Sequence, residues 1–149
     1  MPSNELSNFE LINIIKDFKL DFGFGGVLSK DQLPELKRDK FYIINLEDHD
    51  GPSGGTHWTC FYYNQPLTSI YFDSYGFIAP QDVQNKITPY IFNDAEIQDF
   101  NSSACGYFCI GFIKFLHNKS DKQEAYKTFL KLFKLNTLKN DKILQQSLY

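Results

Sequence analysis

Apolar residues near the amino terminus recur at the spacing of one helix face: Phe9, Ile12, Ile15 and Phe18. This pattern predicts a helix that ends near Lys19. Ser7 and Glu10 fit a capping box, in which a hydroxyl and a carboxylate satisfy free N–H groups of the first turn. For the glycine-rich segment 22–26 we expect a loop. Without a predicted strand before it or a Lys-Ser/Thr pair after it, this segment does not indicate a phosphate-binding loop.

Three segments are rich in β-branched and aromatic residues, as buried strands are: 41–46, 57–63 and 70–73. A turn-rich connector at 51–55 leads into the second segment, and a hairpin-sized loop at 64–69 leads into the third. We expect a short helix after Pro80, because proline is tolerated in the first helical turn. A further strand is predicted at 95–100.

The remainder of the chain is predicted to be helical. A strongly apolar helix runs from Cys105 to about His117. Residues 120–123 fit a second capping box, and the helix that follows has apolar positions at Ala125, Phe129, Leu132 and Phe133. A last helix is predicted after Thr137. Because no linker or repeat divides the chain, we expect a single α+β domain over 1–149.

Composition is that of a folded globular protein. The chain has 149 residues, of which 42% are hydrophobic and 17% aromatic, and this excludes a disordered chain. No apolar run reaches the ~18 residues of a membrane-spanning helix, and the first five residues do not resemble a signal peptide. Three cysteines cannot form a closed disulfide set, which favours a reducing, intracellular environment. We therefore expect neither secretion nor a membrane partner.

Charge is distributed unevenly along the chain. The net charge is −3, but residues 1–105 carry a balance of −8 and residues 106–149 a balance of +5. A basic C-terminal third can contact a polyanion such as DNA. The commoner explanation is that these lysines lie on the solvated faces of amphipathic helices. Arg38 is the only arginine, so extensive arginine-based reading of nucleic acid is not expected.

Cys105 is the candidate nucleophile, because it lies where the apolar helix should begin. The positive end of the helix dipole favours a thiolate at that position, and Gly106 allows a substrate to approach the backbone closely. Cys109 lies one turn later and Cys60 lies on a predicted strand, where we expect it in the core. A buried cysteine is usually only a small apolar residue, so the assignment of Cys105 depends on its partners.

Those partners are His57 and Asp73. A hairpin that turns at 64–69 brings Asp73 within one to three positions of facing His57. His57 can then act as general base for the thiol, while Asp73 orients the imidazole ring. Each residue alone also fits a plainer role, a hydrogen-bonded histidine at a strand end or an acid that caps a turn.

Gln98, seven residues before Cys105, is a candidate oxyanion donor together with the Cys105 N–H group. The alternative for Gln98 is a surface glutamine on a strand. No set of His and Cys residues completes the four ligands of a zinc site, so no metal is predicted.

Three motifs, in this order, resemble the adenovirus maturation protease (adenain) family: Gly54-Gly55-Thr56-His57-Trp58, Phe72-Asp73-Ser74-Tyr75-Gly76-Phe77, and Gln98 to Cys109, which reads QDFNSSACGYFC. The resemblance covers roughly residues 5–118. It implies a papain-like cysteine protease core with permuted His-Asp-Cys order, in which a central mixed sheet packs against the Cys-bearing helix. It further implies that Gln98 lies at the oxyanion hole and that Trp58 binds substrate by roofing a narrow cleft, which favours glycine near the scissile bond.

Within that family, the small size of the chain and its Lys/Asn/Ile-rich composition resemble those of proteases of virophages and polinton-type elements. The resemblance implies a monomeric cysteine endopeptidase that cleaves viral capsid or core precursor proteins during virion maturation, in the virion and the viral factory of the host cell. The residues themselves require no cofactor, whereas the resemblance implies a peptide or DNA activator. One alternative is a SUMO- or ubiquitin-like-protein deconjugating protease. Those enzymes usually have the glutamine six residues before the cysteine and an aspartate where this chain has Ala104. The second alternative is a non-catalytic binding module of the same fold.

Overall fold

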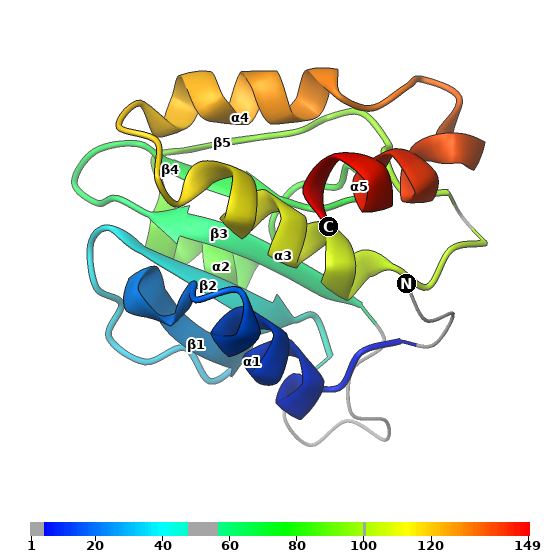
Figure 1. Ribbon diagram of the computed structural model, residues 1–149. Coiled ribbons are helices and arrows are strands. Elements are labelled where there is room, and N and C mark those ends of the chain that lie inside the picture. Colours follow the sequence, from blue (N-terminus) through cyan, green and yellow to red (C-terminus); the bar gives the residue numbers. More distant parts are fainter. Residues whose placement is uncertain (1–4, 48–56, 100) are drawn as a thin grey trace.

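A five-stranded mixed sheet forms the centre of the fold (Figure 1). The computed structural model describes residues 5–47, 57–99 and 101–149. The strands lie in the order β1-β2-β3-β4-β5 and span Phe24–Ser29, Lys40–Asn45, Trp58–Tyr63, Ser69–Phe72 and Tyr90–Phe92. The central pairs β2–β3 and β3–β4 are antiparallel, and both outer pairs are parallel. The predicted connector at 51–55 and His49 lie outside the described residues.

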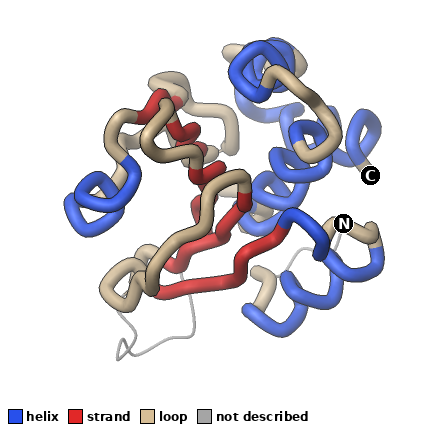
Figure 2. Tube along the Cα trace, turned by 90° about the vertical axis from the view of Figure 1, so that its left-hand side faces the viewer, coloured by secondary structure: helices blue, strands red, loops and turns tan. Residues whose placement is uncertain are grey.

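Helices cover both faces of this sheet (Figures 1 and 2). On one face lie α1, α3, α4 and α5, which span Asn8–Asp17, Cys105–Leu116, Lys122–Lys131 and Asn140–Leu148. On the other face lies α2, Gln81–Ile87. Two short 3₁₀ turns, η1 at Asp21–Gly23 and η2 at Thr137–Lys139, precede β1 and α5. A sheet that is covered on both faces needs strands that are apolar on both sides.

Alternation along the strands divides the core in two. In β2, Phe41 and Ile43 face the helical layer with α3, while Tyr42 and Ile44 face α2. In β4 the ring of Phe72 stacks against Phe112 of α3, with ring centroids 5.4 Å apart. Side chains on a strand alternate between the two faces, so strands β2 to β4 contribute to both cores.

Helix α3 is the most deeply buried helix of the fold. Every residue from Cys105 to Ile113 is buried, because the sheet, α1, α4 and α5 surround it. Gly111 permits the close approach of α5, since a Cβ atom there would lie 2.7 Å from a methyl carbon of Leu144. The sheet and three helices therefore fix the position of α3, which begins at Cys105.

Most predicted elements are present. The capping box of Ser7 and Glu10 opens α1, and strands occur at 40–45, 58–63 and 69–72. The mixed α+β class is confirmed. No helix in the described part of the chain is long and apolar enough to cross a membrane.

Three local predictions were wrong. The segment 22–26 is not a loop, because β1 begins at Phe24; its glycines accommodate a bulge and the Tyr42 ring, which lies 2.2 Å from where a Cβ of Gly25 would be. The strand predicted at 95–100 is instead β5 at Tyr90–Phe92. The cap of α4 is one residue later than predicted, since the Asp121 side chain accepts a hydrogen bond from the Glu124 N–H.

The contact between α3 and α5 gives a test of the packing. We expect Gly111→Leu to lower the free energy of unfolding by about 1–3 kcal/mol, because an added side chain must displace α5, although leucine favours the helix more than glycine does. Gly23→Leu is the matched control, since no described atom lies within 4 Å of a Cβ built there. Urea denaturation measures both variants, and equal stabilities would contradict the packing argument.

Candidate active site

His57 and Asp73 lie at adjacent ends of two paired strands. His57 immediately precedes β3 and Asp73 immediately follows β4, whose last paired residue, Phe72, lies opposite Cys60. The His57 Nε2 atom is 2.8 Å from Oδ1 of Asp73. Asp73 is buried, with 1% of its side chain exposed, and 15% of the His57 side chain is exposed. The structure thus brings together His57 and Asp73, which the predicted hairpin was expected to place close to each other.

A tight turn directs the Asp73 carboxylate. The Tyr75 N–H donates to Asp73 Oδ1 over 2.8 Å, and the Gly76 N–H donates to the Asp73 carbonyl over 2.8 Å. Gly76 has φ +82°, and a Cβ atom there would lie 2.8 Å from the Ala95 carbonyl. Glycine at this position therefore permits both the turn and the contact with Ala95.

Tyr75 contacts all three parts of the site. Its ring stacks on the His57 imidazole, with centroids 4.6 Å apart and planes inclined by 28°. Its hydroxyl donates to the Ser102 carbonyl over 3.3 Å, in the loop that leads to Cys105. Sequence reasoning did not assign a role to Tyr75. The only signal was its place in the acid-x-aromatic-Gly-Phe motif, two residues after the acid.

Cys105 is the first residue of α3 and is 3% exposed. The Cys105 side chain is one of the groups that raise the pKa of His57. Burial alone would lower the pKa of His57, but the hydrogen bond to Asp73 and the nearby Cys105 side chain raise it to about 9. The other ring nitrogen, Nδ1, has no hydrogen-bond partner among the described residues. His57 therefore favours its protonated form between a carboxylate and a thiol.

Gln98 links the loop of the acid to the loop of the cysteine. Its Nε2 donates to the Ser102 carbonyl over 2.8 Å, and its Oε1 accepts from the Ser74 hydroxyl over 2.5 Å. The backbone N–H groups of Ile97 and Gln98 both donate to the Ser74 carbonyl, which explains why this segment is not a strand. Gln98 has no exposed surface. Its role as an oxyanion donor stays a prediction, and the alternative of a surface glutamine is excluded.

Trp58 lies in the core, not over a cleft. It is 2% exposed, and its indole N–H donates to the Leu6 carbonyl over 2.8 Å. The indole is buried in the same core cluster as Cys105 and has almost no surface open to a substrate, so the predicted contact of Trp58 with substrate is corrected. The expected preference for glycine near the scissile bond was based on that contact, and the structure removes this basis.

The other two cysteines are buried in the core, as expected for Cys60. Cys60 has no exposed surface and Cys109 is 1% exposed. Burial raises the pKa of Cys109 well above its usual range, which keeps that thiol protonated and unreactive. No group of three or more His, Cys, Asp or Glu side chains in the described ranges is arranged to hold a metal ion.

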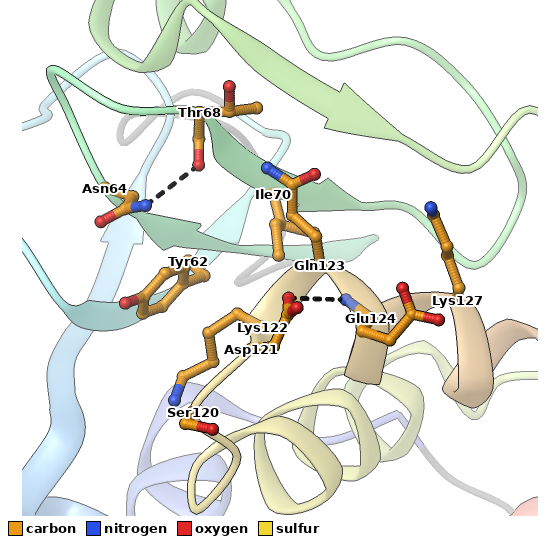
Figure 3. Close-up of a pocket in the computed structure, with 10 residues that line it drawn as sticks. All are labelled: Tyr62, Asn64, Thr68, Ile70, Ser120, Asp121, Lys122, Gln123, Glu124 and Lys127. Atoms are coloured by element: carbon orange, nitrogen blue, oxygen red, sulfur yellow. Dashed lines mark hydrogen bonds between the residues drawn. The ribbon is translucent and has the colours of Figure 1, made fainter.

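A separate pocket of about 580 Å³ lies between the β3–β4 hairpin and the start of α4 (Figure 3). Its lining is mostly polar and carries both signs of charge, with Asp121 and Glu124 beside Lys122 and Lys127. It includes none of the candidate catalytic residues. The pocket is therefore distinct from the site of His57 and Asp73.

Comparison with known proteins identifies no relative: no protein-family model matches the chain, and no curated sequence matches it significantly.

Proposed function

We propose that the protein is a cysteine endopeptidase with Cys105 as nucleophile. The observation that carries this proposal is the 2.8 Å hydrogen bond between His57 Nε2 and the buried Asp73 carboxylate. The Cys105 side chain is among the groups that raise the pKa of His57. A base held by an acid and directed at a nucleophile is the arrangement that activates a thiol. A protonated imidazole and a helix N-terminus beside a cysteine are both general means of activating a thiol.

In the proposed reaction the Cys105 thiolate attacks the carbonyl carbon of a peptide bond. The proton held by His57 passes to the leaving amine, which departs and leaves an acyl thioester on Sγ. His57 then takes a proton from water, which hydrolyses the thioester and regenerates the thiolate. The Cys105 N–H and the Gln98 amide, whose second Nε2 hydrogen is not used by Ser102, are the proposed donors to the oxyanion.

The resemblance to adenain extends this proposal to a substrate and a fold. We propose a papain-like core in permuted order, because the histidine and the acid lie at the ends of strands that precede the cysteine-bearing helix. The proposed substrates are capsid or core precursor proteins, cleaved in the virion or the viral factory. The seven-residue spacing from Gln98 to Cys105 favours this assignment over a SUMO- or ubiquitin-like deconjugating protease. The presence of all four residues His57, Asp73, Gln98 and Cys105 favours it over a non-catalytic module, which has no need for the complete set.

Substitution of the cysteines tests the nucleophile. We expect Cys105→Ala to abolish cleavage of capsid precursors from the same source, because no other described thiol lies beside His57. New termini are detected by mass spectrometry. Cys109→Ala is the matched control, one helical turn away in the same helix, and should keep most of the activity. Thermal unfolding checks that both variants fold, and equal losses of activity in folded variants would refute the assignment.

The pH dependence of cleavage tests the acid. His57 is protonated below its pKa of about 9, so kcat/KM should fall as the pH rises through that value, because His57 then loses the proton that it delivers to the leaving amine. Asp73→Asn removes the contribution of Asp73 to this raised pKa, while the contribution of Cys105 and the burial that lowers the pKa remain. The alkaline limit should therefore move to lower pH, with reduced kcat. An unchanged alkaline limit in Asp73→Asn would show that Asp73 does not control His57.

We propose a cluster of cations as the location of the DNA contact. Lys19, Arg38, Lys40 and Lys122 line a pocket of about 220 Å³, together with His117 and a single acid, Asp39. Burial and the charges of Lys122 and Lys119 lower the pKa of His117. Three of these four cations come from the N-terminal part of the chain, so the C-terminal third alone does not define the proposed contact.

Charge reversal at this pocket tests the DNA contact. We expect the double variant Lys19→Glu/Arg38→Glu to weaken binding of duplex DNA by about tenfold at low salt and to reduce the salt dependence of the affinity. The control Lys131→Glu/Lys139→Glu changes the net charge equally in the C-terminal third, outside the pocket. Fluorescence anisotropy across a salt series measures both. Equal weakening, or no binding by the parent protein, would rule out this location.

A further inference from the structure

Asn93 makes a two-point contact with the backbone of the catalytic acid. It follows β5 directly, and its side-chain Oδ1 accepts a hydrogen bond from the Asp73 N–H over 3.1 Å. Its Nδ2 donates to the Asp73 carbonyl over 2.6 Å. One planar amide therefore satisfies both peptide groups of Asp73, as a neighbouring strand would do.

This contact begins where the strand pairing ends. The parallel pairing of β4 and β5 extends to Tyr71 opposite Phe92, and Asp73 lies two residues beyond Tyr71. Asp73 and Asn93 are both buried, with 1% and 3% exposure. A buried N–H or carbonyl group without a partner is costly. The Asn93 side chain thus takes the place of the absent strand residue beside Asp73.

Asn93 is itself fixed from a third element. The single hydroxyl hydrogen of Tyr126, in α4, is shared between two acceptors, Asn93 Oδ1 and the Tyr71 carbonyl, each 3.1 Å from the hydroxyl oxygen. Burial raises the pKa of Tyr126 well above its usual range, so the hydroxyl remains a donor. Asn93 Nδ2 also donates to the Ala95 carbonyl over 3.3 Å. These contacts fix which end of the amide faces each peptide group of Asp73.

We propose that Asn93 is a positioning residue for the catalytic acid, which holds the Asp73 backbone so that Oδ1 faces His57 Nε2. The direction of a short side chain follows its backbone, and Asp73 Oδ1 must lie at once 2.8 Å from His57 Nε2 and 2.8 Å from the Tyr75 nitrogen. A rotation of the Asp73 peptide lengthens the hydrogen bond to His57. The catalytic consequence of this inference depends on the proposed protease function, whereas its effect on His57 does not.

The test measures His57 directly in the full-length protein. In Asn93→Leu, which keeps the shape but removes the hydrogen bonds, NMR titration of the imidazole should show the pKa of His57 lowered from about 9 toward its ordinary value. The expected kcat falls by about tenfold to a hundredfold, with KM little changed, since small displacements of catalytic groups have effects of this size. Asn93→Ser is the second variant, because it leaves room for water at the buried peptide groups if Asn93→Leu does not fold.

Asn140 offers a closely matched control. It has no exposed surface, and its amide pairs in the same two-point way with the N–H and carbonyl groups of Lys134, both over 2.9 Å. Asn140→Ser should therefore lower stability without lowering the pKa of His57. An unchanged His57 pKa in a folded Asn93 variant, or an equal decrease in Asn140→Ser, would overturn the proposal. A lowered pKa in a protein that cleaves no peptide would instead support the positioning role and refute the protease function.

Discussion

The burial of the Asp73 carboxylate is the constraint on which the candidate site depends. A carboxylate removed from water is costly unless donors surround it, and Asp73 is 1% exposed. His57 and the Tyr75 N–H supply those donors at Oδ1, while the peptide groups of Asp73 bond to Gly76 and Asn93. The same set of contacts that compensates the burial also directs the carboxylate, so stability and orientation have one cause.

Sequence reasoning succeeded where the information was local. The apolar periodicity of α3, the capping box of α1 and the β-branched segment of β2 are patterns that neighbouring residues determine. The pairing of His57 with Asp73 was also accessible, because a short hairpin restricts the register. These features suffice to nominate the catalytic residues and the mixed α+β class.

The remaining features depend on contacts between distant segments. The glycines of β1 led to the prediction of a loop instead of a strand. A glycine is needed there because of the Tyr42 ring of β2, and the local sequence pattern does not indicate that contact. Asn93 lies 20 residues from Asp73, and Tyr126 lies 33 residues from Asn93. Which face of β3 carries Trp58 depends on where α1 packs, since the Leu6 carbonyl accepts its indole N–H. Local propensity contains none of this information.

The C-terminal helices support the site although they carry no proposed catalytic residue. Tyr126 of α4 reaches Asn93, while Asp141 of α5 accepts a hydrogen bond from the Ser102 hydroxyl over 2.7 Å. That hydroxyl in turn accepts from the Ala104 N–H over 3.1 Å, directly before Cys105. Helix α4 therefore supports the segment beside Asp73, and α5 supports the loop before Cys105. Gln98 bonds to both loops, through Ser74 and Ser102. Because α4 and α5 both pack on α3, and because Tyr126 and Asp141 bond to the segments beside Asp73 and Cys105, the chain beyond Cys105 is part of the geometry of the site.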